Sequence, residues 1–258
     1  MVFELKNIEK SFGEKKVLTG VSFKAEGGKA FGLLGRNGAG KTTSIRILMD
    51  VFPANSGEVL IDGQPIDYNK IGIGYLPEER GLYPKKIIID QLTYFAELKG
   101  MGRKAAVQSI DYWLGRLGMT EYRNKKLETL SKGNQQKIQL ITALAHDPDI
   151  IILDEPFSGL DPVNAMLLKD VVKEQIAKGK IVLFSSHQMS YIEEFCDSIA
   201  ILNNGVVALH GDLHDIKRDY PRDRLVVKTE TPDAIIADFD SSCTVMDNGD
   251  LMIRLGSP

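Results

Sequence analysis

Cysteine, tryptophan and long apolar runs are all scarce in this chain, and each scarcity excludes a class of protein. Its 258 residues include two cysteines and one tryptophan. Cys196 and Cys243 lie far apart without the spacing of a metal site, so we expect two reduced, buried thiols. No apolar run approaches the roughly 18 residues of a membrane-spanning helix, and the first residues lack the apolar stretch of a signal peptide. We therefore expect any membrane role to come through a partner.

A surplus of basic charge is also missing. The formal net charge is −3, which gives no electrostatic footprint for nucleic acid or for an anionic membrane surface. Hydrophobic residues make up 43% and charged residues 26% of the chain, as in an ordinary globular protein. The length suits one large α/β domain, alone or with an appendage.

A phosphate-binding loop is the strongest motif that is present. Gly35 to Thr42 match the pattern Gly-x-x-x-x-Gly-Lys-[Ser/Thr]. Glycines let the backbone wrap a phosphate, Lys41 can reach the β- and γ-phosphates, and the Thr42 hydroxyl can ligate Mg²⁺. The flanks predict a buried strand at residues 29–34 and a helix opening at residues 43–49, whose positive end adds to the anion site. The predicted nucleotide-binding residues here are Gly35, Arg36, Asn37, Gly38, Ala39, Gly40, Lys41, Thr42 and Thr43.

The pattern of apolar residues predicts an α/β domain over residues 1–212. Residues 1–34 are rich in predicted strands, and about 85–147 form a helical subdomain because apolar residues recur three and four apart. Buried strands then alternate with helices, which favours a mostly parallel sheet. The predicted strands are 2–6, 21–25, 57–61, 150–153 and 181–184, the helices are 90–98, with Asp90 as its N-cap, 105–117, 134–145 and 164–177, and a hairpin covers 199–209.

The remaining residues, 213–258, have a different character. Residues 213–223 are charged and are predicted to be a linker. A strand at 225–229, a short helix at 232–239 and a hairpin around Asn248-Gly249 then predict a small α/β accessory domain. The last predicted strand lies near the end of the chain, so a continuation of this domain is left open.

Two carboxylates follow the predicted strand 150–153. Asp154, delivered beside the phosphate loop by a buried strand, can hold Mg²⁺ directly or through water. Glu155 is then placed to orient or deprotonate an attacking water. The structural alternative is a helix cap after a strand. The phosphate loop upstream favours the functional interpretation.

The stretch Leu130-Ser131-Lys132-Gly133-Asn134-Gln135 resembles the Leu-Ser-Gly-Gly-Gln signature of the ATP-binding cassette (ABC) ATPases. Other elements of that family follow in order over residues 2–212. Phe12 lies at the position of an adenine-stacking aromatic, Glu78 at the Q-loop, Asp161 in the D-loop run 158–161, and His187 at the switch histidine.

The resemblance implies a P-loop NTPase fold of the ABC type. This fold has a RecA-like, mostly parallel sheet, an N-terminal antiparallel β subdomain, an inserted helical subdomain and, here, a C-terminal appendage. ATP and Mg²⁺ are the implied ligands. The implied catalytic residues are Glu155, His187 and Lys41, the metal ligands are Thr42, Asp154 and Glu78, and ATP is also contacted by Phe12 and, from a second subunit, by Ser131, Lys132, Gly133, Asn134 and Asp161.

Two departures from the family pattern concern charge. Glu78 replaces the usual glutamine, and its carboxylate can still ligate Mg²⁺ or bind water. Lys132 replaces a glycine and either adds a cation near the partner's phosphate or points to solvent. Asn134 replaces the signature glutamine and shortens the reach of its amide.

The resemblance favours the ATP-hydrolysing subunit of a bacterial exporter, similar to the sodium-export and multidrug-export type. We then expect a head-to-tail pair, a homodimer, with two shared ATP molecules. An integral membrane permease would dock near residues 78–92 and hold the subunit at the cytoplasmic face of the membrane. No nucleic-acid partner is expected, and the cargo is not specified by the cassette.

Two other functions are weighed against this one. A soluble cassette ATPase acting on DNA or the ribosome is disfavoured by the single cassette, the mild acidity and the lack of a sustained heptad between residues 91 and 130. A regulatory module that binds nucleotide without turnover is disfavoured by the joint presence of Lys41, Asp154, Glu155 and His187.

Overall fold

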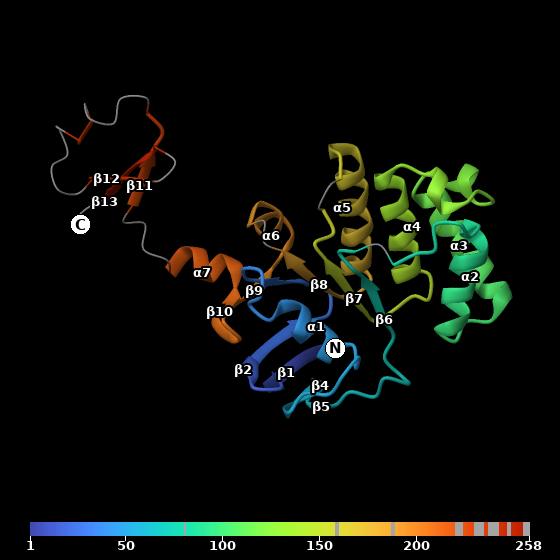
Figure 1. The fold of residues 1–258 in the computed structure, drawn as a ribbon, viewed down its shortest axis with the longest axis horizontal. Coiled ribbons are helices and arrows are strands. Elements are labelled where there is room, and N and C mark those ends of the chain that lie inside the picture. The colour runs from blue at the N-terminus through green and yellow to red at the C-terminus, as the bar shows by residue number, and fades with distance from the viewer. Residues whose placement is uncertain are drawn as a thin grey trace. The chain divides into compact units, whose positions relative to one another are not determined.

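The computed structural model describes residues 1–79, 81–157, 160–186, 189–219, 224–229, 235–236, 243–246 and 249–254. The chain divides into two compact units, Met1–Leu213 and His214–Pro258. The first unit contains two β-sheets and most of the helices (Figure 1).

An antiparallel sheet of four strands occupies the start of the chain, in the order β2-β1-β4-β5. Alternation of apolar and polar residues directs Phe3 and Leu5 of β1 into the core, and both are fully buried. The strands are β1 (Val2–Phe12), β2 (Lys15–Glu26), β4 (Ser56–Ile61) and β5 (Gln64–Pro65).

A second sheet has six strands in the order β10-β9-β3-β8-β7-β6. All its neighbours pair in parallel except β10, which is antiparallel to β9. The central strands are buried along their whole length, as their continuous apolar runs predict. The strands are β3 (Ala30–Leu34), β6 (Ile73–Leu76), β7 (Ile150–Asp154), β8 (Ile181–Ser186), β9 (Ser198–Asn203) and β10 (Val206–Asp212).

Three helices, α2 (Ile88–Leu98), α3 (Arg103–Arg116) and α4 (Lys132–Leu144), form the helical region between β6 and β7. They pack on one another, and α4 also packs on β6 (Figure 1). The expectation that Asp90 caps α2 is wrong, because α2 begins at Ile88 with Ile87 as the N-cap residue. Asp90 lies in the first turn instead, where a negative charge is favourable.

Three further helices follow strands of the parallel sheet: α1 (Lys41–Leu48) after β3, α5 (Pro162–Ala177) after β7, and α6 (Met189–Phe195) after β8. Since parallel strands end at the same edge, the residues after β3, β6, β7 and β8 gather there. This edge is where the functional residues predicted from the sequence should meet.

Residues 213–219 do not form the expected linker but a helix, α7 (Leu213–Asp219). The charges that suggested a linker stabilise this helix instead. Asp215 lies in its first turn, Lys217 and Arg218 lie in its last, and Arg218 Nη1 is 3.0 Å from Asp215 Oδ1.

The second unit contains a three-stranded antiparallel sheet in the order β11-β13-β12. Its strands are β11 (Arg224–Val227), β12 (Cys243–Val245) and β13 (Leu251–Arg254). Leu251 and Ile253 on the central strand are buried. The helix expected at 232–239 falls largely outside the described residues, which include only 235–236 of it.

The two cysteines are free, but only one is fully buried. Burial raises the pKa of the Cys196 thiol to about 12. Cys243 is only partly buried, because it lies on β12 at an edge of its sheet. In the described part of the chain, none of the helices combines the length and apolarity that crossing a bilayer requires.

Candidate functional site

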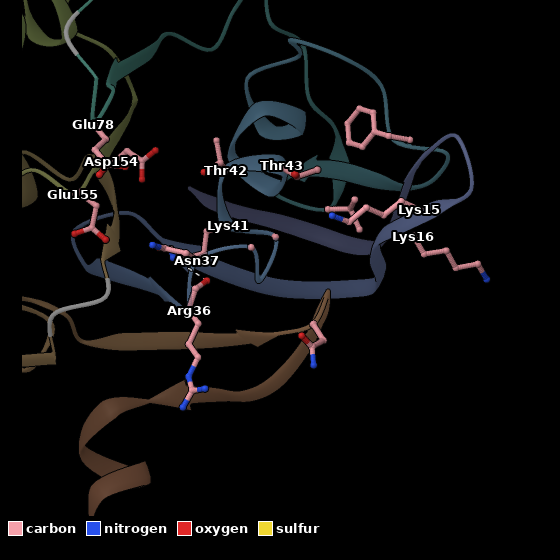
Figure 2. A pocket seen from close by; sticks show the side chains of 15 residues that line it. Lys15, Lys16, Arg36, Asn37, Lys41, Thr42, Thr43, Glu78, Asp154 and Glu155 are labelled. Atoms are coloured by element: carbon pink, nitrogen blue, oxygen red, sulfur yellow. Dashed lines mark hydrogen bonds between the residues drawn. The ribbon is translucent and has the colours of Figure 1, made fainter. Parts of the chain in front are cut away.

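A cavity of about 830 Å³ opens beside the loop between β3 and α1. Several separate parts of the chain form its walls (Figure 2). The turn between β1 and β2 forms one wall, the phosphate-loop residues form the floor, and carboxylates after β6 and β7 form the far side. The cavity therefore joins an aromatic and basic end to an acidic end.

The loop that forms the floor has a backbone conformation that only glycine adopts readily. Gly35 has a φ of 151°, and a Cβ atom there would lie 2.5 Å from the Leu202 carbonyl oxygen. Gly40, with a φ of 112°, is the N-cap residue of α1. No side chain caps this helix and its first turn carries no acidic residue, so its N–H groups can bind an anion.

Lys41 lies at the centre of this loop and is buried. Its Nζ donates hydrogen bonds to the carbonyl oxygens of Gly35, at 2.6 Å, and Arg36, at 3.4 Å. The Lys41 side chain thus lies across the loop, where the phosphate of a nucleotide would bind. Thr42 and Thr43 line the cavity next to it.

Two predicted loop residues support the loop from behind and do not line the cavity. Gly35 provides the carbonyl that binds Lys41. Ala39 is buried, and its carbonyl oxygen accepts a hydrogen bond from the Gly205 N–H at 3.1 Å. The hairpin between β9 and β10 therefore braces the loop.

Asp154 ends β7 at the acidic side of the cavity and is 6% exposed. The Tyr75 hydroxyl donates to its Oδ2 at 3.2 Å. Burial raises the pKa of Asp154 above its ordinary value, and the Tyr75 hydrogen bond opposes this shift only in part. Because burial disfavours the charged carboxylate, a cation bound beside Asp154 would stabilise it.

Glu155 follows directly and is held in place on both sides. Its N–H donates to the Ser185 carbonyl oxygen at 2.8 Å, and the Ser186 hydroxyl donates to its Oε2 at 3.0 Å. Its φ of 48° is in the left-handed region, which is strained for a residue with a side chain. Strain at this residue, beside a phosphate loop, is typical of a functional position.

Oxygen donors that suit Mg²⁺ meet between the loop and the carboxylates. Thr42, Glu78 and Asp154 line this cavity together, and they also line a second cavity of about 710 Å³ next to it. Among the described residues, no three His, Cys, Asp or Glu side chains are grouped closely enough to hold a metal alone. The donor set therefore fits an ion shared with phosphate oxygens, as is usual for Mg²⁺.

Phe12 forms the opposite end of the cavity and is 50% exposed. Phe52 packs edge-on against it, with ring centroids 5.4 Å apart and an interplanar angle of 87°. Lys10 Nζ lies 5.3 Å from the Phe12 centroid. These contacts fix the ring and leave exposed aromatic surface for a base to stack on.

The signature residues lie elsewhere on the molecule and do not line this cavity. Ser131 is exposed and caps α4, with its Oγ accepting from the Asn134 N–H at 3.4 Å. Asp161 caps α5 by accepting from the Asn164 N–H at 3.0 Å, and this hydrogen bond lowers its pKa. A Cβ atom on Gly133 would lie 3.0 Å from Asn164 Nδ2, so the starts of α4 and α5 are adjacent.

Lys132 is exposed, whereas Gly133 and Asn134 are partly buried. Neither the start of α4 nor the start of α5 lines the nucleotide cavity. Ser158, Gly159 and the predicted switch residue His187 lie outside the described residues.

Four cavity residues were not predicted from the sequence: Lys15, Lys16, Val17 and Asn204. The lysines follow Phe12 closely, so their nearness to the predicted stacking residue was an available signal. Asn204 lies in the β9–β10 turn, far from the loop in sequence, and no local pattern connects the two.

Comparison with known proteins agrees with this geometry. Residues 18–158 match the family model described as ABC transporter. The chain is 47% identical to the uncharacterized ABC transporter ATP-binding protein YhaQ of Bacillus subtilis, over 87% of this chain and 76% of that protein. It is 33% identical to the linearmycin resistance ATP-binding protein LnrL of Bacillus subtilis, over 83% of this chain and 70% of that protein.

Another relative is the Nod factor export ATP-binding protein I of Burkholderia lata, 32% identical over 82% of this chain and 71% of that protein. A solved structure of an ATP-binding subunit of an ABC transporter superposes with a TM-score of 0.77 at 31% identity, covering 84% of this chain and 92% of that one. The expected fold, a P-loop NTPase of the ABC type, is confirmed. The chain therefore belongs to the ABC transporter family, as an ATP-binding subunit that hydrolyses ATP.

Proposed function

We propose that this chain is the ATPase subunit of an exporter and that two copies pair head to tail around two ATP molecules. One observation carries the proposal. The phosphate loop, Asp154 and Glu155 share a cavity, whereas Ser131 and Asp161 lie at helix starts outside it. The first turn of a helix has several N–H groups without an intrahelical partner, and those that its cap does not bind can bind an anion. A second copy is therefore needed to bring these groups to the γ-phosphate.

Within one copy, the two ends of the cavity bind different parts of the nucleotide. Phe12 stacks on the adenine, the N–H groups of residues 36–43 and Lys41 hold the phosphates, and Thr42, Asp154 and Glu78 hold Mg²⁺. When bound, Mg²⁺ neutralises charge that develops on the phosphate oxygens. Burial raises the pKa of Asp154, and a cation facing the carboxylate opposes this shift and favours its charged form.

Glu155 is the general base of the proposed hydrolysis. Its Oε2 is fixed by Ser186, and the carboxylate lines the cavity near the acidic end. It accepts a proton from the attacking water as the oxygen bonds to phosphorus and the ADP oxygen leaves. His187, outside the described residues, is proposed to hydrogen-bond the γ-phosphate, as the family resemblance implies.

Export and membrane attachment are proposed from relatives and from the second cavity. Relatives of this chain are named for linearmycin resistance and for Nod factor export. The cavity of about 710 Å³ joins Glu78 and Leu82 to Phe95 and Lys99 of α2. A permease helix docked there would touch the same Glu78 that lines the ATP cavity, and it would hold the subunit at the inner face of the membrane. No comparison points to nucleic acid or the ribosome.

The test uses the Glu155→Gln variant, which keeps the shape of the side chain but removes the base. With Mg²⁺ and ATP we expect a stable dimer by light scattering and a turnover lower by about 10²- to 10⁴-fold. The same variant with ADP should stay monomeric, because ADP lacks the shared γ-phosphate.

Two control variants separate the two halves of the site. Glu155→Gln with Lys41→Ala should fail to bind ATP, and Glu155→Gln with Ser131→Arg should bind ATP yet remain monomeric. Hydrolysis at the wild-type rate in Glu155→Gln would refute the base assignment. A dimer that forms equally well with and without ATP would refute the shared site.

A further inference from the structure

Lys15 lies beside Phe12 on the face of the antiparallel sheet that forms the wall of the ATP cavity. In the register of β1 and β2, Phe12 is directly opposite Lys15. Directly opposite residues in an antiparallel pair share a face. Along β2, alternation places Lys15 and Val17 on this face and Lys16 on the other.

The side chains follow this alternation. Figure 2 shows Lys15 extending toward Thr43 at the start of α1, while Lys16 extends away from the loop. Lys15 is exposed and forms no hydrogen bond or ion pair with any residue that the structure describes. Its ammonium group is therefore available to a ligand in the cavity.

The order of groups along the cavity identifies what this ammonium would meet. Phe12 marks the base end, and Lys41 with Thr42 and Asp154 marks the β- and γ-phosphate end. Lys15 is paired with Phe12 across the strands and extends toward Thr43 (Figure 2), so its ammonium group is on the side of the base that leads to the first phosphate. A lysine ammonium is a compact charge that binds a phosphate oxygen well without fixed geometry.

We propose that Lys15 binds the α-phosphate of the bound nucleotide and adds to the preference of this site for nucleotides over nucleosides. The proposal rests on the ATP site described under the proposed function. It adds a contact outside the phosphate loop, from Lys15, the residue opposite Phe12 in the β1–β2 pair.

The experiment measures dissociation constants of ATP, ADP and adenosine, with Mg²⁺ present, for the full chain and four variants. Lys15→Gln should weaken ATP and ADP binding equally, by about fivefold, the value of one exposed charge contact. Adenosine binding should not change. Lys15→Arg should restore most of the loss, because it keeps the charge.

Lys6→Gln is the matched control, since it removes the same charge from an exposed position of the same sheet that does not line the cavity. It should change ATP binding by less than about twofold. The loss caused by Lys15→Gln should also shrink when the salt concentration is raised from about 0.05 M to about 0.5 M, as expected for a screened charge. A purely structural role would give no salt dependence.

Several results would overturn the proposal. A loss for ATP alone would place Lys15 at the γ-phosphate, and an equal loss for adenosine would place it at the base or ribose. Equal effects of Lys15→Gln and Lys6→Gln would mean a general charge effect. If Lys41→Ala bound ATP as tightly as wild type, the ATP site itself would be wrong, which is a separate outcome from an unaltered Lys15→Gln variant.

Discussion

Gln136 of α4 donates a hydrogen bond from its side-chain Nε2 to the carbonyl oxygen of Pro156, at 2.7 Å. This contact joins the helix that begins at the signature to the residue directly after Glu155. One turn further along α4, Gln139 Nε2 donates to the carbonyl oxygen of Glu79 at 2.9 Å, next to Glu78. A single helix therefore fixes the loops that carry both acidic side chains.

We expect Gln136→Ala to lower the free energy of unfolding by about 1 kcal/mol, the typical net value of one hydrogen bond. The rate of ATP hydrolysis should fall several-fold, because the loop carrying Glu155 loses a fixed point, while ATP affinity changes little. Thermal unfolding and steady-state kinetics check both. Gln108→Ala, at an exposed position of α3, is the control. A change in affinity without a change in turnover would contradict this role.

The phosphate loop should not tolerate a side chain at Gly35. An alanine there combines a positive φ with a contact of 2.5 Å to the Leu202 carbonyl oxygen. We expect Gly35→Ala to destabilise the protein by about 2 kcal/mol or more and to abolish ATP binding. Gly13→Ala is the control, since Gly13 has a φ of 59° but open space around it, and should cost about 1 kcal/mol. Urea titrations of the two variants should differ accordingly, and equal losses would show that the close contact is unimportant.

Asp154 should make the nucleotide-free protein less stable as the pH rises. Burial raises its pKa in the folded chain, so the folded state binds the proton more tightly than the unfolded state. The stability it contributes is complete below about pH 4, the unfolded pKa, and is lost as the pH rises through the folded pKa. Asp154→Asn should therefore raise the melting temperature near neutral pH, and the difference should shrink toward about pH 4.

The ligand dependence of the same variant provides a second measurement. Wild-type protein should gain additional melting temperature when Mg²⁺ is added to ATP, and Asp154→Asn should gain little. Asp50→Asn, at an exposed carboxylate of the same unit, is the control. A melting temperature of Asp154→Asn below that of wild type at neutral pH would show that the carboxylate does not destabilise the nucleotide-free protein.

Base stacking should depend on the support behind Phe12 as well as on Phe12 itself. Phe12→Ala should weaken ATP and GTP binding alike, by about three- to tenfold, because stacking tolerates either base. Phe12→Tyr should bind as wild type. Phe52→Leu should produce an intermediate loss, since it removes the edge contact at 5.4 Å that orients the ring. Competition titrations against ATP provide these values, and an unchanged affinity in Phe12→Ala would remove Phe12 from the site.

Local sequence patterns were sufficient for the parts of the site formed by neighbouring residues. The phosphate loop lies between one strand and one helix, and Asp154 and Glu155 come at the end of one apolar strand. The spacing alone therefore predicted that the loop and the two carboxylates lie close together. Helices α3, α4 and α5 were also predicted to within a few residues, because each has a strong apolar period.

The contacts that depend on pairing could not be predicted in this way. Which of Lys15 and Lys16 shares a face with Phe12 depends on the register across the β1–β2 turn, since a shift of one residue exchanges the faces. Asn204 reaches the cavity through hydrogen bonds that join distant segments, including Gly205 N–H to Ala39 O. The charges of residues 213–219 indicated a linker, yet their order along the chain suits a helix.

Phe12 belongs to the antiparallel sheet, whereas Asp154 belongs to the parallel sheet. A nucleotide held at both ends consequently adds a removable contact between two sheets that already share one hydrophobic core. We therefore expect bound ATP to stabilise both sheets together, and we expect its cleavage to remove the contact at the phosphate end while the base end stays bound.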